Sequence, residues 1–242
     1  MQLLRKLYIC LYFLNMFVQM QTQIITTEDG SHSLYVPHLE EQYHSTHGAI
    51  QESRHVYINA GLVSCPLRNI NILEIGFGTG LNAFLSLLQA EETGVTVNYT
   101  SLELYPLDIE TAKQLNYSQH LTNNANAPLF TALHTSPWNE TIEITPHFSL
   151  HKIETDFSNP DNLTTSTLFD VIYFDAFAPE KQPEMWSQAI FDKLYTLSNP
   201  NAIITTYCAK GVVRRMLQSA RFTVERLPGP PGKREILRGR KL

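Results

Sequence analysis

The chain has 242 residues, of which 17% are charged and 10% aromatic, with a formal net charge of −5. That length accommodates one α/β domain whose hydrophobic core is large enough to stabilise the fold without disulfides or metals, and the composition excludes a disordered chain. Three widely spaced cysteines match neither a disulfide framework nor a Cys-x-x-Cys metal site, so we expect a reducing, cytoplasmic compartment.

The charge is distributed unevenly along the chain. From Tyr207 to the C-terminus there are ten basic and two acidic residues, a balance of +8. The preceding residues hold eight basic and 21 acidic ones, a balance of −13. Such asymmetry is typical of a surface that binds a polyanion, and also of a solvated basic tail. Charge alone leaves both readings open.

The N-terminus carries a short apolar run, residues 7–18, after Arg5 and Lys6. It is shorter than the ~20 residues of a membrane-spanning helix, and no small-x-small cleavage site follows it. A weak signal peptide is one interpretation. We favour a start of translation at Met20, which makes residues 1–19 an extension and residues 20–242 one domain, with a strand-rich segment at 24–69. No association with a membrane is expected.

A glycine-rich turn follows a short apolar run at residues 70–75, which is typical of a buried strand. Gly76, Gly78 and Gly80 alternate, and apolar residues then recur at helical spacing. This order of strand, glycine turn and helix is the first half of a nucleotide-binding unit. The third glycine comes one residue too early for the dinucleotide fingerprint, and Glu74 precedes the first, so NAD is disfavoured. A turn without a ligand is the alternative.

Two acidic residues follow the next predicted strands. Glu103 lies at the tip of a β-rich run, where a carboxylate can accept hydrogen bonds from both ribose hydroxyls of a nucleoside. Asp156 follows the strand 148–155 and could bind an adenine amino group, or simply cap the next turn. Either residue could instead be an ordinary polar group at a strand end.

The most distinctive stretch is Asp175-Ala-Phe-Ala-Pro179, which follows a buried strand at 169–174. Because the carboxyl ends of parallel strands meet at one edge of the sheet, we expect Asp175 in the same crevice as the glycine turn. A carboxylate there can orient an amine and accept its proton. Phe177 offers an aromatic face and Pro179 stiffens the loop. The alternative is an aspartate that only forms a turn.

The remaining elements complete an alternating pattern. We expect helices at 49–62, 106–120, 184–197 and 208–220, strands at 202–207 and 222–227, a final strand after the turn at 228–232, and irregular structure at 122–147. His44 and His47 have no third ligand at metal spacing, so no metal site is predicted.

Three motifs together resemble one known family. They are Leu73–Asn82, Asp175–Trp186 and Gly232–Gly239, and they resemble the methyltransferase domain of the MnmC family, which makes 5-methylaminomethyl-uridine at the tRNA wobble position. The resemblance covers the chain from about residue 22 to its end. It implies a Rossmann-like α/β fold of the S-adenosylmethionine (SAM)-dependent methyltransferases. That fold has a mostly parallel seven-stranded sheet with an antiparallel last strand and helices on both faces.

The resemblance also implies roles for particular residues, with SAM as methyl donor, no metal, and no FAD in this chain. The residues expected to bind SAM are Glu74, Gly76, Phe77, Gly78, Gly80, Glu103 and Asp156. Asp175 would face the acceptor amine as the catalytic residue. The residues expected to bind the substrate are Phe177, Pro179, Arg214, Arg215, Lys233 and Arg234.

The function implied is methylation of the aminomethyl group of 5-aminomethyl-(2-thio)uridine in the anticodon region of tRNA. The basic C-terminal segment would contact phosphates. As a stand-alone form without an oxidoreductase domain, the chain would depend on separate enzymes for that uridine. An aminopropyltransferase, a small-amine methyltransferase and a non-catalytic SAM- or RNA-binding module remain alternatives.

Overall fold

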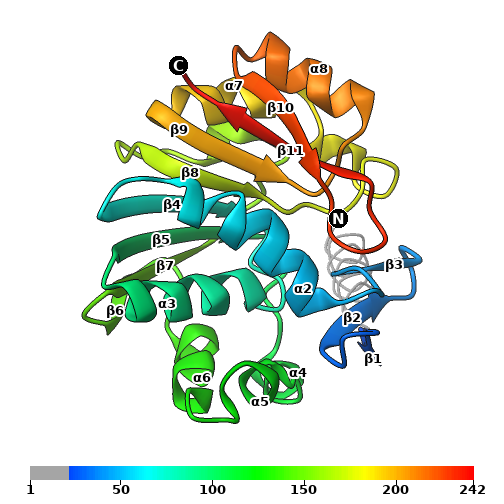
Figure 1. Ribbon diagram of the computed structural model, residues 1–242, viewed down its shortest axis with the longest axis vertical. Coiled ribbons are helices and arrows are strands. Elements are labelled where there is room, and N and C mark those ends of the chain that lie inside the picture. The colour runs from blue at the N-terminus through cyan, green and yellow to red at the C-terminus, as the bar shows by residue number, and fades with distance from the viewer. Residues whose placement is uncertain (1–21) are drawn as a thin grey trace, which may run out of the picture.

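A computed structural model describes residues 22–242, so the expectations for residues 1–19 lie outside the described residues. The chain forms two sheets (Figure 1). The smaller is a three-stranded antiparallel sheet of β1 (Gln23–Thr26), β2 (His32–Val36) and β3 (Glu41–Gln42). Among residues 22–242, no helix is both long and apolar enough to cross a membrane.

The larger sheet has eight strands in the order β10-β11-β9-β8-β4-β5-β7-β6. Its strands are β4 (Asn69–Ile75), β5 (Thr96–Glu103), β6 (Thr141–Thr145), β7 (Phe148–Glu154), β8 (Phe169–Phe174), β9 (Ser198–Thr206), β10 (Thr223–Pro228) and β11 (Glu235–Arg240). Strands β9, β8, β4, β5 and β7 are parallel, and their carboxyl ends share one edge. β11 is antiparallel to both β9 and β10, and β6 is antiparallel to β7.

Helices cover both faces of this sheet (Figure 1). They are α2 (Ala49–Ser53), the π-helical η1 (Arg54–Asn59), η2 (Leu62–Ser64), α3 (Leu81–Thr93), α4 (Ile109–Lys113), α5 (Tyr117–Thr122), α6 (Ala127–Thr135), η3 (Pro160–Asn162), η4 (Pro183–Met185), α7 (Gln188–Thr196) and α8 (Gly211–Ser219). Alternate residues of β8 point to opposite faces. Tyr173 packs in the core with Phe84 of α3, and Ile172 packs in a second core with Phe191 of α7.

The predicted fold class is confirmed, with differences inside residues 106–147. The sheet has eight strands rather than seven, because β6 lies in the stretch expected to be irregular, which also contains α6. β6 is an edge strand without a fully buried residue, so its alternation of threonine, glutamate and isoleucine gives a weak apolar signal. The single helix expected at 106–120 is two short helices, α4 and α5.

The N-terminal segment and the turn between β10 and β11 meet near the carboxyl edge of the parallel strands. The turn between β10 and β11 reaches toward the segment that joins β3 to α2 (Figure 1). The ring Nε2 of His55 lies 2.8 Å from the Pro228 carbonyl oxygen, and the Lys233 ammonium pairs with Glu52. The N-terminal segment and the C-terminal turn therefore both contribute to the site at that edge.

Candidate active site

A cavity of about 310 Å³ lies at the carboxyl ends of β4, β5, β8 and β9. That volume is at the lower end of the range for small-molecule sites. Its wall includes the glycine turn after β4, residues 102–105 after β5, residues 155–157 after β7, residues 175–178 after β8, and residues 41–46 of the N-terminal segment. The predicted convergence of strand ends is therefore present.

The glycine turn forms one wall of this cavity. Gly76, Phe77 and Gly78 line it, whereas Gly80 caps the start of α3 and does not. Gly78 has a φ of +49°, and a Cβ on it would lie 2.9 Å from carbons of the Tyr43 ring. Only glycine combines this backbone conformation with so close an aromatic neighbour. The backbone of the turn is thus open toward the cavity.

Glu103 and Asp156, both expected to bind SAM, line the cavity. One Glu103 oxygen accepts the N–H of Gly78 at 2.9 Å, and the other accepts those of Leu104 and Tyr105 at the same distance. Burial raises the pKa of the Glu103 carboxyl. Its hydrogen bonds fix the carboxylate against the glycine turn, and they use three of the about four acceptor sites of a carboxylate, so about one site remains for a ligand. Asp156 accepts the Ser158 N–H, which forms a tight turn.

Glu74 does not line the cavity, although it was predicted to contact the cofactor. Its side chain is fully buried, and it accepts a hydrogen bond of 2.6 Å from the Ser101 hydroxyl. Burial raises the pKa of Glu74 to about 8. The reason is strand geometry: Glu74 is inside β4, so its side chain points to a face of the sheet rather than beyond the strand end.

Asp175 lies where β8 ends and opens onto the cavity. Its Oδ1 accepts a 2.5 Å hydrogen bond from the Tyr57 hydroxyl, and its Oδ2 accepts one of 2.8 Å from the Asn82 amide. Burial raises the pKa of Asp175 to about 6, against the lowering effect of these hydrogen bonds. The side chain is therefore oriented from both sides and ionised at neutral pH.

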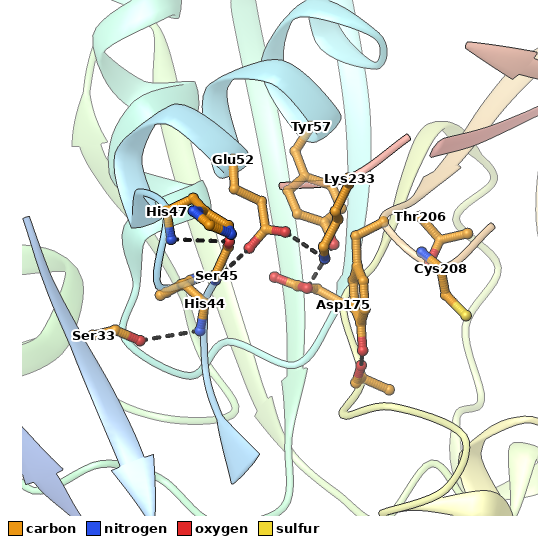
Figure 2. Close-up of polar contacts among 12 residues, drawn as sticks. Ser33, His44, Ser45, His47, Glu52, Tyr57, Asp175, Thr206, Cys208 and Lys233 are labelled. Carbon is orange, nitrogen blue, oxygen red and sulfur yellow. Dashed lines mark hydrogen bonds and ion pairs between the residues drawn. The ribbon is translucent and has the colours of Figure 1, made fainter. Parts of the chain in front are cut away.

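An ion pair lies beside Asp175 (Figure 2). The Lys233 ammonium is 2.5 Å from Glu52 Oε1, and Glu52 Oε2 accepts the Ser45 N–H at 2.7 Å. The same ammonium lies 3.9 Å from the centre of the Tyr207 ring, so a cation–π contact adds to the ion pair. Lys233, predicted to bind substrate, lines the cavity.

Of the other predicted substrate residues, only Phe177 lines the cavity. Its ring meets that of Tyr43 edge to face, with 5.1 Å between the ring centres. Pro179 is in the same loop but outside the cavity wall. Arg214, Arg215 and Arg234 also lie outside it: Arg215 and Arg234 are exposed, and Arg214 is half-buried on α8.

The basic C-terminal segment is not an open tail. Five of its ten basic residues form ion pairs with carboxylates within residues 22–242, namely Lys210, Arg226, Lys233, Arg238 and Arg240. Arg226, Arg238 and Arg240 pair with Glu225 and Glu235, which the +8 balance already counts, so only the pairs of Lys210 with Glu180 and of Lys233 with Glu52 offset it.

The two loop histidines have separate partners. His44 Nε2 lies 2.8 Å from the Thr79 hydroxyl, and His47 pairs with Glu28. Across the described part of the chain, no group of three or more histidine, cysteine, aspartate or glutamate side chains could hold a metal ion.

Sequence reasoning missed several residues that line the cavity or touch Asp175. They are Tyr43, His44, Glu52, Tyr57 and Tyr207. All except Tyr207 come from the N-terminal segment, which has no nucleotide-binding motif. Tyr207 directly follows β9, and its position at a strand end was the available signal.

Comparison with known proteins identifies the class. Residues 134–242 match the family model described as S-adenosyl-L-methionine-dependent methyltransferase. The chain is 33% identical over 220 residues to the tRNA 5-methylaminomethyl-2-thiouridine biosynthesis bifunctional protein MnmC of Cupriavidus necator, covering 82% of this chain and 31% of that protein. It is 29% identical over 220 residues to the MnmC of Methylobacillus flagellatus, covering 85% and 33%. The chain thus spans about a third of the curated relatives it matches.

Solved structures show the same fold. MNMC2 from Aquifex aeolicus superposes with a TM-score of 0.75 at 23% identity, over 90% of this chain and 69% of that one. Spermidine synthase from Thermotoga maritima superposes with a TM-score of 0.55 at 12% identity, over 91% and 72%. Residues 134–242 thus match the S-adenosyl-L-methionine-dependent methyltransferase family, and the chain shares the fold of MNMC2. Within this class its sequence is MnmC-like, and the resemblance indicated by the three motifs is confirmed.

Proposed function

We propose that this chain transfers a methyl group from SAM to the aminomethyl nitrogen of 5-aminomethyl-(2-thio)uridine at the wobble position of tRNA. The observation that carries the proposal is the meeting of Asp175 with the glycine turn and Glu103 in one cavity. The names of the MnmC relatives support the choice of tRNA as substrate.

The residues around the cavity fit SAM by their chemistry. Glu103 can accept ribose hydroxyls, and Asp156 can accept an adenine amino group. Gly76 and Gly78 leave the backbone open to a ligand, and Phe77 and Phe157 supply apolar surface. When bound, SAM supplies a methyl carbon that is electrophilic because it is attached to a sulfonium.

Asp175 is the group that can activate the acceptor. Its inner lone pairs are engaged by Tyr57 and Asn82, and its remaining lone pairs are available to an amine N–H in the cavity. The amine must attack with a free lone pair, so one of its protons passes to Asp175 as the new N–C bond forms. Phe177 and Tyr43 narrow the cavity beside Asp175 and exclude water.

The rate is expected to depend on pH through Asp175. Its pKa of about 6 lies above the usual aspartate value, so the carboxylate is ionised above pH 6 and protonated below it. Below pH 6 Asp175 itself is protonated, so it cannot accept a proton from the amine. We expect kcat/KM to fall about tenfold for each pH unit below 6. A profile of initial rates between pH 4.5 and 8 measures this, and a rate that stays level down to pH 4.5 would contradict it.

Gly78→Ala is expected to weaken SAM binding about tenfold, because the new Cβ displaces the Tyr43 ring at the cavity wall. Gly94→Ala is the matched control: Gly94 also has a positive φ, +66°, but nothing lies within 4 Å of its Cβ position. Both variants place alanine in a left-handed backbone conformation, which costs free energy, so both should unfold at a lower temperature than the wild type. Titration calorimetry should show the affinity loss for Gly78→Ala alone. Equal SAM affinities in the two variants would show that the turn does not contact the cofactor.

The finer features of the proposal follow from the same reaction. Residues 20–242 act as one methyltransferase domain in the cytoplasm, on the anticodon region of tRNA, and other enzymes supply the 5-aminomethyl-uridine. Arg214, Arg215 and Arg234 contact tRNA phosphates outside the cavity, so affinity for tRNA decreases with added salt.

Counting labelled methyl groups tests the reaction class. The protein is incubated with SAM labelled in its methyl group and with either tRNA from cells lacking the gene or a small diamine such as putrescine. We expect label in tRNA alone. Label in the diamine alone would replace the proposal with a small-amine methyltransferase. No label in either, with SAM bound, would indicate a binding module.

A further inference from the structure

Tyr57 makes a contact that the reaction as described does not require. Its hydroxyl donates a 2.5 Å hydrogen bond to Oδ1 of Asp175, across 118 positions of sequence. The Tyr57 side chain is 1% exposed, and Figure 2 shows it approaching Asp175 from the helical segment above the cavity. A buried hydroxyl aimed at a carboxylate is one of the stronger neutral donors available to it.

The backbone around Tyr57 is unusual. Residues 54–59 form a π-helix, in which the Ala60 N–H reaches the His55 carbonyl five residues back, at 3.3 Å. The wider turn buries three consecutive side chains, Val56, Tyr57 and Ile58. Gly61 follows shortly after this segment, and a Cβ on it would lie 2.4 Å from the Tyr57 carbonyl oxygen. Single π-helical turns are rare and occur mostly at functional sites.

We propose that Tyr57 is the positioning residue for Asp175: its hydroxyl holds the carboxylate in one orientation and directs the transferred proton to the cavity side. This inference rests on the proposed function in one respect: the proposed function identifies the amine as the source of the proton. The arrangement of Tyr57, Asn82 and Asp175 is independent of the substrate.

The hydrogen bonds account for the direction of proton transfer. Tyr57 and Asn82 each donate to a different oxygen of Asp175, so the inner side of the carboxylate is already occupied. In the transfer step the amine N–H bond breaks and an O–H bond forms on a lone pair that faces the cavity. The nitrogen lone pair forms the new N–C bond, and the electrons of the broken C–S bond remain on sulfur. The transferred proton is therefore held on the side of Asp175 that faces the cavity.

Charged and titratable groups face Asp175 from every element around it. They are Glu52 of α2, Tyr57 of η1, Glu74 of β4, Tyr99 of β5, Tyr207 after β9 and Lys233 of the C-terminal turn. The Tyr57 hydrogen bond and the Lys233 charge lower the pKa of Asp175, and the Glu52 charge raises it. Removing Tyr57 or Glu52 should therefore shift that pKa in opposite directions.

The test compares Tyr57→Phe with Tyr173→Phe. Both variants keep a buried ring in one aromatic cluster, with 5.2 Å between the ring centres, but the Tyr173 hydroxyl is near Ser86 and does not touch Asp175. The pKa of Asp175 is measured by carbon NMR of ¹³C-carboxyl aspartate in the protein alone, assigned with Asp175→Asn. We expect Tyr57→Phe to raise it by about one unit, and Glu52→Gln to lower it. Tyr173→Phe should leave it unchanged.

Kinetics give the second readout. Tyr57→Phe should reduce kcat about tenfold, leave the SAM affinity unchanged, and move the acid limb of the pH profile upward by the same unit. An unchanged Asp175 pKa in Tyr57→Phe, or equal shifts in both tyrosine variants, would overturn the inference. The NMR measurement needs no substrate, so it still tests the role of Tyr57 if the wild-type protein fails to methylate tRNA. That failure would overturn only the proposed function.

Discussion

Asp175→Asn is expected to lower kcat by about 10²- to 10⁴-fold, the range for loss of a positioned proton acceptor. Asparagine has the same shape as aspartate but cannot take the amine proton. Because the Asp175 carboxylate is held by Tyr57 and Asn82, whereas Glu103 binds the glycine turn, the affinity for SAM should change little. Single-turnover methyl transfer and calorimetry with SAM measure the two quantities separately.

The control for Asp175→Asn is Asp192→Asn. Asp192 is an exposed carboxylate on α7 that accepts a hydrogen bond from Gln188 and lies outside the cavity wall. This change should leave both rate and affinity unaffected. A loss of SAM affinity as large as the loss of rate in Asp175→Asn would assign Asp175 to the cofactor and contradict its role toward the amine.

Glu103→Ala is expected to weaken SAM binding about 100-fold. The change removes the acceptor for ribose hydroxyls and leaves the N–H groups of Gly78, Leu104 and Tyr105 without this carboxylate. One lost hydrogen bond to a charged group, at up to about 3 kcal/mol, corresponds to that factor. With saturating SAM, kcat should recover most of its wild-type value, since Asp175 is intact.

The neighbouring strand offers a matched control for Glu103→Ala. Glu154 is the cross-strand partner of Glu103 in the parallel pairing of β5 and β7, but its side chain is exposed. Glu154→Ala removes the same charge at the same level of the sheet and should preserve SAM affinity. Comparable losses in the two variants would mean that general electrostatics, rather than a ribose contact, holds the cofactor.

The sequence predicted those site residues whose positions follow from strand ends. Gly76, Gly78, Glu103 and Asp175 all come directly after or at the tips of parallel strands, and the geometry of such sheets brings these ends together. Glu74 is the instructive exception. It is one residue before the last of β4, and the alternation of side chains along a strand could have placed it on a face of the sheet.

The N-terminal half of the site could not be predicted in this way. Glu52 and Tyr57 lie in a segment that was expected to be helical. Their contacts were not expected, because Glu52 pairs with Lys233 and Tyr57 bonds to Asp175, which are both distant in the sequence. The π-helical turn that points Tyr57 inward has no recognisable sequence signal. The ion pairs of Lys210 with Glu180 and of Lys233 with Glu52 likewise join the basic segment to distant carboxylates, which a count of charges along the sequence does not show.

The most direct measurement is mass spectrometry of nucleosides from tRNA that has been incubated with the purified protein and SAM. The tRNA comes from cells that lack the gene, so 5-aminomethyl-(2-thio)uridine is present as acceptor. We expect that nucleoside to gain the mass of one methyl group on its side-chain nitrogen, and the gain at a fixed early time to be strongly reduced with Asp175→Asn. An unchanged nucleoside, or a methyl group on any other position of the tRNA, would contradict the assignment of Asp175 and its cavity to this reaction.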